Sequence, residues 1–212
     1  MPPANDHYYT AEPSSEHRPG EVRFCYGGRE LVFATDSGVF SRRELDRGTE
    51  VLLAALPESV AGPVLDMGCG DGTIGVAVGA RWPGLSVTMA DVNRRACDLA
   101  RENARRNGVR AEVMESDGYM ALTGRRFATI LQNPPIRAGK AVIYRMFADG
   151  AASLLPGGEL YIVIRKQQGA PSAMNYLATL FDEVAVVEKK SGYWVLRCAA
   201  PHQDTEEDTK DV

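Results

Sequence analysis

The sequence is poor in the residues that hold metals or build disulfide frameworks. It contains three histidines and four cysteines among 212 residues, and no two cysteines form a Cys-x-x-Cys pair. Closely spaced cysteines and histidines are typical of zinc sites, and dense cysteines are typical of small secreted domains. We therefore predict a reduced protein without a metal site.

The sequence also lacks a long apolar run and an N-terminal signal pattern. A membrane-spanning helix needs about 20 consecutive apolar residues, and no segment approaches that length. These absences predict a cytoplasmic protein with no membrane partner. The net charge of -4 belongs to residues 203–212, which hold five acids and one lysine and are expected to form a disordered tail. The balanced charge of residues 1–202 neither favours nor excludes nucleic-acid binding.

Two patterns divide the rest of the chain. After an irregular entry over residues 1–20, apolar residues alternate on both sides of Gly27-Gly28, which predicts a β-hairpin with a tight turn. A short helix is expected from Asp46 to Leu56, stopped by Pro57. We predict a cap over residues 1–58, one domain over residues 59–202 and the acidic tail after it.

Strand-like and helix-like segments alternate from residue 64 onward. Strands are expected at residues 64–67, 86–91, 111–115, 127–133 and 159–166, and a terminal hairpin at residues 183–188 and 193–198. Helices are expected at residues 73–81, 93–107, 141–155 and 171–181. This alternation predicts an α/β fold, a doubly wound, mostly parallel, seven-stranded Rossmann-like sheet with a C-terminal antiparallel hairpin.

A glycine-rich loop follows the first strand of this region. Glycines let the backbone turn tightly and approach a ligand, and the helix behind the loop offers free amides. The glycines expected to contact the ligand are Gly68, Gly70 and Gly72. The spacing to Gly75 also matches a dinucleotide fingerprint, although the match begins two residues into the loop.

Carboxylates around the loop indicate which ligand it holds. Asp66 and Asp71 flank the loop and would repel a pyrophosphate, whereas they attract the ammonium and sulfonium of S-adenosylmethionine. Asp91 and Val92 end the next strand, where a carboxylate can accept hydrogen bonds from ribose hydroxyls. Ser116-Asp117 ends the third strand, where a carboxylate can accept from an adenine amino group. These residues predict an S-adenosylmethionine site.

An Asn-Pro-Pro sequence ends the fourth strand. The side-chain oxygen of Asn133 and the carbonyl of Pro134 could accept the two hydrogens of an exocyclic amine and aim its lone pair at a methyl group. The prolines restrict the backbone and pre-set these acceptors. We predict that Asn133 and Pro134 are catalytic in the methylation of a nitrogen, with Asn133 also beside the cofactor.

The chain resembles the RsmC-like methyltransferases, the group related to small-subunit ribosomal RNA guanine-N2 methyltransferases. The motifs that carry the resemblance are His7-Tyr8-Tyr9, Thr35–Ser41, Leu45–Thr49, the glycine loop, Asn133–Ile136 and Arg165–Ala170. The resemblance implies the class I methyltransferase fold and transfer from S-adenosylmethionine, leaving S-adenosylhomocysteine, to the N2 amine of a guanine in ribosomal RNA or the small subunit. It also implies that Phe40 and Gly48 lie near the methionine end of the cofactor.

The substrate side departs from the common pattern. Many Asn-Pro-Pro enzymes carry Phe or Tyr at the next position, where a ring can stack on the target base, and this chain carries Ile136. Cations that could contact RNA phosphates lie near the predicted strand ends and in the cap. The predicted substrate-binding residues are Pro135, Ile136, Arg137, Lys140 and Lys166.

Three alternatives stay open on the sequence alone. The acceptor could be a protein glutamine amide or an adenine in nucleic acid instead of guanine. The chain could be a non-catalytic, cofactor-binding module in ribosome assembly. A nicotinamide-dependent oxidoreductase would also use a glycine loop, and the two loop carboxylates argue against it. The sequence predicts neither the target nucleotide nor the oligomeric state.

Overall fold

The computed structural model describes residues 20–36 and 45–202. Seven strands form one sheet in the order β5-β4-β3-β6-β7-β9-β8, and β1 and β2 form a separate hairpin. The strands of the large sheet are β3 (Val64–Met67), β4 (Val87–Asp91), β5 (Ala111–Glu115), β6 (Phe127–Gln132), β7 (Leu154–Arg165), β8 (Phe181–Lys190) and β9 (Tyr193–Pro201). The five strands from β5 to β7 run parallel, and β8 and β9 are antiparallel to their neighbours. The predicted fold class is confirmed.

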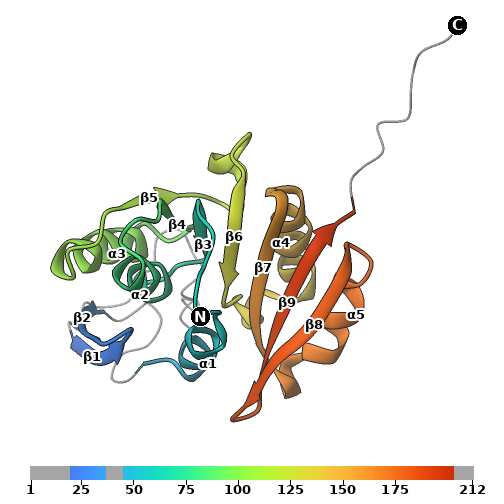
Figure 1. The fold of residues 1–212 in the computed structure, drawn as a ribbon, viewed down its shortest axis with the longest axis horizontal. Coiled ribbons are helices and arrows are strands. Elements are labelled where there is room, and N and C mark those ends of the chain that lie inside the picture. The colour runs from blue at the N-terminus through green and yellow to red at the C-terminus, as the bar shows by residue number, and fades with distance from the viewer. Residues whose placement is uncertain (1–19, 37–44, 203–212) are drawn as a thin grey trace, which may run out of the picture.

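Helices cover both faces of this sheet (Figure 1). They are α1 (Arg47–Ala55), α2 (Thr73–Arg81), α3 (Arg94–Arg106), α4 (Lys140–Ala152) and α5 (Ala170–Leu177), with short 3-10 turns η1 (Met120–Leu122), η2 (Ile136–Ala138) and η3 (Lys166–Gln168). Asn93 caps α3 as predicted, because its side chain accepts a hydrogen bond from the Ala96 amide.

Alternation along the strands builds two cores. In β7, Tyr161 and Val163 face the core that contains α1 and α2, whereas Leu160, Ile162 and Ile164 face the core that contains α4 and α5. Successive side chains of a strand point to opposite faces, so a sheet buried on both faces has apolar residues throughout.

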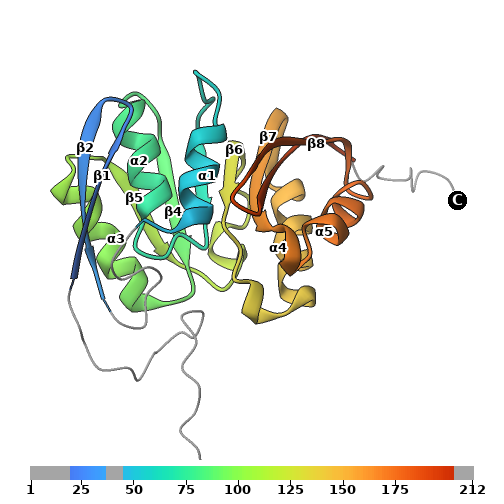
Figure 2. The same cartoon turned by 90° about the horizontal axis from the view of Figure 1, so that it is seen from below.

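The N-terminal hairpin packs on the first of these cores. It consists of β1 (Gly20–Tyr26) and β2 (Arg29–Thr35), and Leu31 and Phe33 are fully buried in the same core as α2. Gly27 and Gly28 both have positive φ, as the predicted tight turn requires. Figure 2 shows the hairpin lying across α2 and α3. The predicted boundary between cap and domain at residue 58 stays a prediction.

Several predicted boundaries of helices and strands were wrong. Helix α4 ends at Ala152 instead of residue 155, and β7 begins at Leu154 instead of residue 159. Leu155 precedes Pro156, and the residue before a proline is biased towards extended backbone. Helix α5 ends at Leu177 instead of residue 181, and Phe181 begins β8 with its side chain buried in the second core.

The strand order creates a crevice at one edge of the sheet. The chain builds outward from β3 through β4 to β5, and then returns to place β6 on the other side of β3. Open parallel sheets bind ligands outside the carboxyl ends of the strands at such a reversal. The glycine loop follows β3 and Asn133 follows β6, so both lie at this crevice.

Candidate active site

The side chain of Asn133 is held in one orientation by the start of α1. Its amide nitrogen donates to Asp46 Oδ2 at 2.9 Å and to Thr49 Oγ1 at 3.2 Å. The same Asp46 oxygen caps α1 by accepting from the Thr49 amide at 2.8 Å. A carboxylate can only accept, so the NH₂ group of Asn133 must face Asp46. The Asn133 oxygen has no hydrogen-bond partner among the described residues and stays available as an acceptor.

Gly48 allows this close arrangement. A Cβ at that position would lie 3.0 Å from Asp46 Oδ2, 3.1 Å from Tyr193 Cε1 and 3.4 Å from Asn133 Nδ2. The structure therefore places Gly48 directly against the Asn-Pro-Pro sequence. Phe40, the other predicted cap contact, lies outside the described residues.

The glycine loop adopts backbone conformations that require glycine. Gly68, Gly70 and Gly72 have φ values of +73°, +55° and +82°, which side-chain-bearing residues rarely adopt. A Cβ on Gly72 would also lie 2.9 Å from the Cβ of Ala100 in α3. Gly72 therefore serves the packing of the loop on α3 as well as the turn.

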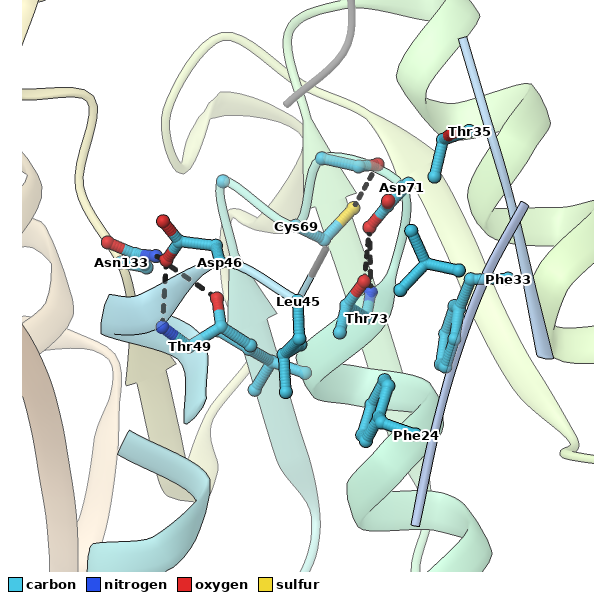
Figure 3. Close-up of a pocket in the computed structure, with 14 residues that line it drawn as sticks. Phe24, Phe33, Thr35, Leu45, Asp46, Thr49, Cys69, Asp71, Thr73 and Asn133 are labelled. Atoms are coloured by element: carbon cyan, nitrogen blue, oxygen red, sulfur yellow. Dashed lines mark hydrogen bonds between the residues drawn. The ribbon is translucent and has the colours of Figure 1, made fainter. Parts of the chain in front are cut away.

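A cavity of about 580 Å³, part of it open solvent, joins the loop to Asn133. Figure 3 shows Asn133, Asp46 and Thr49 on one side of this cavity and Asp71 and Thr73 on the other. The residues lining it are Val22, Phe24, Phe33, Thr35, Leu45, Asp46, Thr49, Gly68, Cys69, Gly70, Asp71, Thr73, Ile74 and Asn133.

The two loop carboxylates are buried, and one of them has an unused oxygen. Asp66 Oδ2 accepts from the Gly75 amide at 2.8 Å, while Asp66 Oδ1 is buried without a hydrogen-bond partner. Asp71 Oδ1 accepts from the amide and the hydroxyl of Thr73. Burial raises the pKa of Asp66 and of Asp71 to about 7 in each case. Of the two carboxylates, Asp71 lines the cavity, so a cationic ligand there would meet a negative charge, whereas Asp66 lies behind the loop outside the cavity lining.

The residues predicted for the ribose and adenine lie along the same sheet edge, outside the lining of this cavity. Asp91 Oδ2 accepts from the Gly70 amide at 2.8 Å and Oδ1 accepts from the Asn93 amide at 2.8 Å. Each oxygen keeps a second lone pair for a hydroxyl. Ser116 donates its amide to the Asp91 carbonyl, Asp117 beside it is exposed, and Val92 is half-buried. Their assignment to the cofactor stays a prediction.

The predicted substrate residues lie on the other side of Asn133. Pro135 and Ile136 enter η2, and Ile136 packs partly against the second core, so its side chain is not a free stacking surface. Arg137 and Lys140 are exposed, and the Lys140 ammonium lies 5.0 Å from the centre of the Tyr144 ring. Lys166 is exposed at the end of β7.

Sequence reasoning missed the hairpin wall of the cavity and the polar contacts that hold it. Asn103 of α3 pairs with the backbone of Ala34, accepting from its amide at 2.7 Å and donating to its carbonyl at 3.0 Å. Asn107 makes the same pair of contacts with Val32. Asn103 also donates to the Asp71 carbonyl at 2.9 Å. Asn103 thus links the hairpin to the glycine loop. The only sequence signal for these contacts is that Asn103 and Asn107 are four residues apart and so lie on one face of α3.

A model of the methyltransferase small domain family matches residues 30–197. The chain belongs to this family. Uncharacterized protein YbxB of Bacillus subtilis is 42% identical over 196 residues, covering 91% of this chain and 98% of its own. Ribosomal RNA small subunit methyltransferase C of Shewanella amazonensis is 33% identical over 188 residues, covering 87% of this chain and 54% of its own.

A solved structure agrees with these relatives. T. thermophilus 16S rRNA N2 G1207 methyltransferase (RsmC), in complex with AdoMet and guanosine, matches with a TM-score of 0.76 and 27% identity. The match covers 89% of this chain and 52% of that chain, so this methyltransferase spans about half the length of the RsmC relatives. The predicted RsmC-like class I methyltransferase and its cofactor, S-adenosylmethionine, are confirmed.

Two further findings concern the described residues, 20–36 and 45–202. Within them, no group of three or more His, Cys, Asp and Glu residues is placed to hold a metal ion. None of their helices is long and apolar enough to cross a membrane.

The buried carboxylates predict how cofactor affinity of this methyltransferase depends on pH. Asp66 and Asp71 have pKa values of about 7 without a ligand, so both lose their negative charge as the pH falls through that value. We expect affinity for S-adenosylmethionine to rise between about pH 6 and about pH 8. The rise should be at most about tenfold per pH unit for each titrating carboxyl group. Calorimetry in buffers of different ionisation enthalpy should show proton release on binding. A flat affinity over this interval would contradict the assignment.

The same groups affect stability with the opposite sign. Their folded pKa values lie above the ordinary aspartate value of 3.8, so the folded state binds more protons than the unfolded state between about pH 4 and about pH 7. The contribution of these groups to the free energy of unfolding of the ligand-free protein should therefore fall as pH rises through this interval. Asp66→Asn should reduce this dependence in thermal unfolding measured across the interval, and an unchanged dependence would remove Asp66 as its source.

Proposed function

We propose that this methyltransferase transfers a methyl group from S-adenosylmethionine to the exocyclic N2 amine of a guanine in ribosomal RNA of the small subunit. The observation that carries the proposal is the fixed orientation of Asn133. Its NH₂ group is committed to Asp46 and Thr49, and its oxygen is left as an acceptor beside the cavity of the glycine loop. The names of the RsmC relatives add the substrate class.

The residues perform the chemistry mainly by positioning. The guanine N2 amine is a poor nucleophile, because its lone pair is delocalised into the base. The Asn133 oxygen and the Pro134 carbonyl accept its two hydrogens, which favours a pyramidal nitrogen with its lone pair directed at the cavity. The bound cofactor supplies an electrophilic methyl on a sulfonium. As the N–C bond forms, the methyl C–S bond would break and leave S-adenosylhomocysteine. The amine then becomes acidic and loses one proton to water, so no strong base is needed beside these acceptors.

Asp46 has a defined part in this arrangement. It fixes the Asn133 amide and the first turn of α1 with one oxygen, so it is a positioning residue. Exchange of its carboxylate for an amide allows the Asn133 side chain to rotate and present its NH₂ group to the substrate. We expect Asp46→Asn to lower kcat by about tenfold, a loss of about 1.4 kcal/mol in transition-state stabilisation, with little change in affinity for S-adenosylmethionine. Unaltered kcat would show that the Asn133 orientation has another origin.

The experiment that tests the function follows labelled methyl groups. The protein is incubated with labelled S-adenosylmethionine and small subunits from a strain that lacks it, and RNA and protein are then separated. The proposal predicts label in the RNA fraction. Label in the protein fraction would favour the glutamine alternative, and no label in either fraction, with S-adenosylmethionine bound, would favour the non-catalytic module.

A further inference from the structure

Three residues from adjacent strands form a row at the end of the sheet. Tyr193 of β9 lies directly opposite Lys190 of β8 and Arg165 of β7 in the antiparallel register. Directly opposed residues point to the same face of a sheet. The Arg165 guanidinium lies 5.7 Å from the centre of the Tyr193 ring. We call these three residues, Arg165, Tyr193 and Lys190, the Tyr193 row.

The row is a neighbour of the Asn-Pro-Pro sequence. The Tyr193 ring edge and the Asn133 amide nitrogen lie 3.1 and 3.4 Å from the point where a Cβ on Gly48 would be. The absence of a side chain at Gly48 thus brings an aromatic ring close to the predicted catalytic asparagine. Tyr193 is half-buried, and its hydroxyl has no hydrogen-bond partner among the described residues.

The turn that carries the row is fixed in place. The guanidinium of Arg47 in α1 donates to Ser191 Oγ at 2.8 and 3.1 Å. The Lys166 amide donates to the Gly192 carbonyl at 2.7 Å. Both views of the fold show the β8–β9 turn beside α1 (Figures 1 and 2). The β8–β9 turn beside Tyr193 is therefore held by contacts to α1 and to the residue that follows β7.

The cations of the row differ from two arginines of α3, which form salt bridges. Arg106 pairs with Glu102 and Glu21, and Arg101 pairs with Asp98. In contrast, Arg165, Lys190 and the adjacent Lys166 are exposed, and no carboxylate of the described residues forms a salt bridge with them. Their charge is thus available to a ligand, whereas Arg101 and Arg106 are paired with carboxylates of α3 and β1.

We propose that the Tyr193 row is the surface that receives the substrate nucleotide, which rests on the proposed function. Tyr193 contacts the target base as its amine reaches Asn133, and Arg165 and Lys190 contact the flanking phosphates. Unpaired nucleotides are bound by this combination of an aromatic ring and cations. The row also supplies the aromatic contact that Ile136 does not offer. The partner is therefore an unstacked nucleotide of RNA, and not a regular duplex.

The chain offers a matched control for the charge. Lys189 is one residue from Lys190 but faces the opposite side, with its ammonium 4.6 Å from the centre of the Trp194 ring. We expect Lys190→Ala and Arg165→Ala each to weaken RNA binding and to reduce the slope of log affinity against log salt by about 0.7–0.9. Lys189→Ala should leave the slope unchanged. Equal slopes for Lys189→Ala and Lys190→Ala would overturn the proposal.

Activity measurements test the ring. Tyr193→Ala should lower kcat/KM for RNA by about tenfold or more, as loss of one aromatic–base contact does, and Tyr193→Phe should retain most of it. Binding of S-adenosylmethionine by both variants shows that they are folded and that the effect is on substrate. Methylation by Tyr193→Ala at the wild-type rate would contradict the role of the Tyr193 row and leave the proposed function standing. If the wild-type protein neither binds nor methylates RNA, the row and the proposed function fall together.

Discussion

Replacement of Asn133 by alanine should reduce kcat by about 10²–10³-fold, the range found when a single preorganised polar group at a reacting centre is removed. The amide nitrogen of Asn133 is already bonded to Asp46 and Thr49, so its oxygen is the group that the substrate amine loses. Affinity for S-adenosylmethionine should stay within a few-fold of wild type. Single-turnover methylation with RNA and calorimetry with the cofactor measure the two quantities separately.

The control for Asn133→Ala is a variant that removes the hydroxyl of Thr49, a hydrogen-bond partner of Asn133. Thr49→Val removes the 3.2 Å contact to Asn133 and keeps the bond to Asp46, so it should lower kcat much less. A large loss of cofactor affinity in Asn133→Ala would place Asn133 in the cofactor pocket and not at the amine. Wild-type kcat in Asn133→Ala would show that Asn133 has no catalytic role.

A pair of asparagines in α3 should separate stability from cofactor binding. Asn103 and Asn107 each pair with the backbone of β2, and only Asn103 also reaches the glycine loop, at the Asp71 carbonyl. We expect Asn103→Ala and Asn107→Ala each to lower the free energy of unfolding by about 2 kcal/mol, because partly buried backbone groups of β2 lose their partners. Only Asn103→Ala should also weaken S-adenosylmethionine binding, by about tenfold or 1.4 kcal/mol.

Denaturant unfolding and calorimetry on the two variants check this expectation. If Asn107→Ala weakens cofactor binding as much as Asn103→Ala does, the hairpin itself and not the loop contact controls the pocket. If neither variant affects binding, the hairpin wall is not needed for the cofactor. In either case the contact between Asn103 and Asp71 would lose the role assigned to it.

The sequence predicted the parts of the site that depend on local patterns. Gly68, Gly70 and Gly72 signal a strand-to-helix turn by their spacing, and Asn133 signals a strand end by the prolines after it. Their joint position at the β3–β6 crevice followed from the alternation of strands and helices. The fold could therefore be predicted from short local patterns in the sequence.

The contacts that were missed join segments far apart in the chain. Asp46 and Asn133 are separated by 87 positions and Ala34 and Asn103 by 69, and nothing local to a capping aspartate or a helix asparagine signals such a partner. Tyr193 reaches the Asn-Pro-Pro sequence only because β9 is inserted beside β7 and Gly48 has no side chain. Such contacts depend on tertiary packing, which a periodicity argument does not supply.

The central claim is that a guanine amine in ribosomal RNA receives the methyl group. To test it, small-subunit RNA is isolated from a strain that lacks this protein and is incubated with the purified protein and S-adenosylmethionine. Mass spectrometry of its nucleosides and fragments then identifies the methylated base. We expect N2-methylguanosine at one position, absent before incubation and absent with Asn133→Ala. Methylated adenosine, or RNA whose nucleosides are unchanged while protein carries the label, would contradict it.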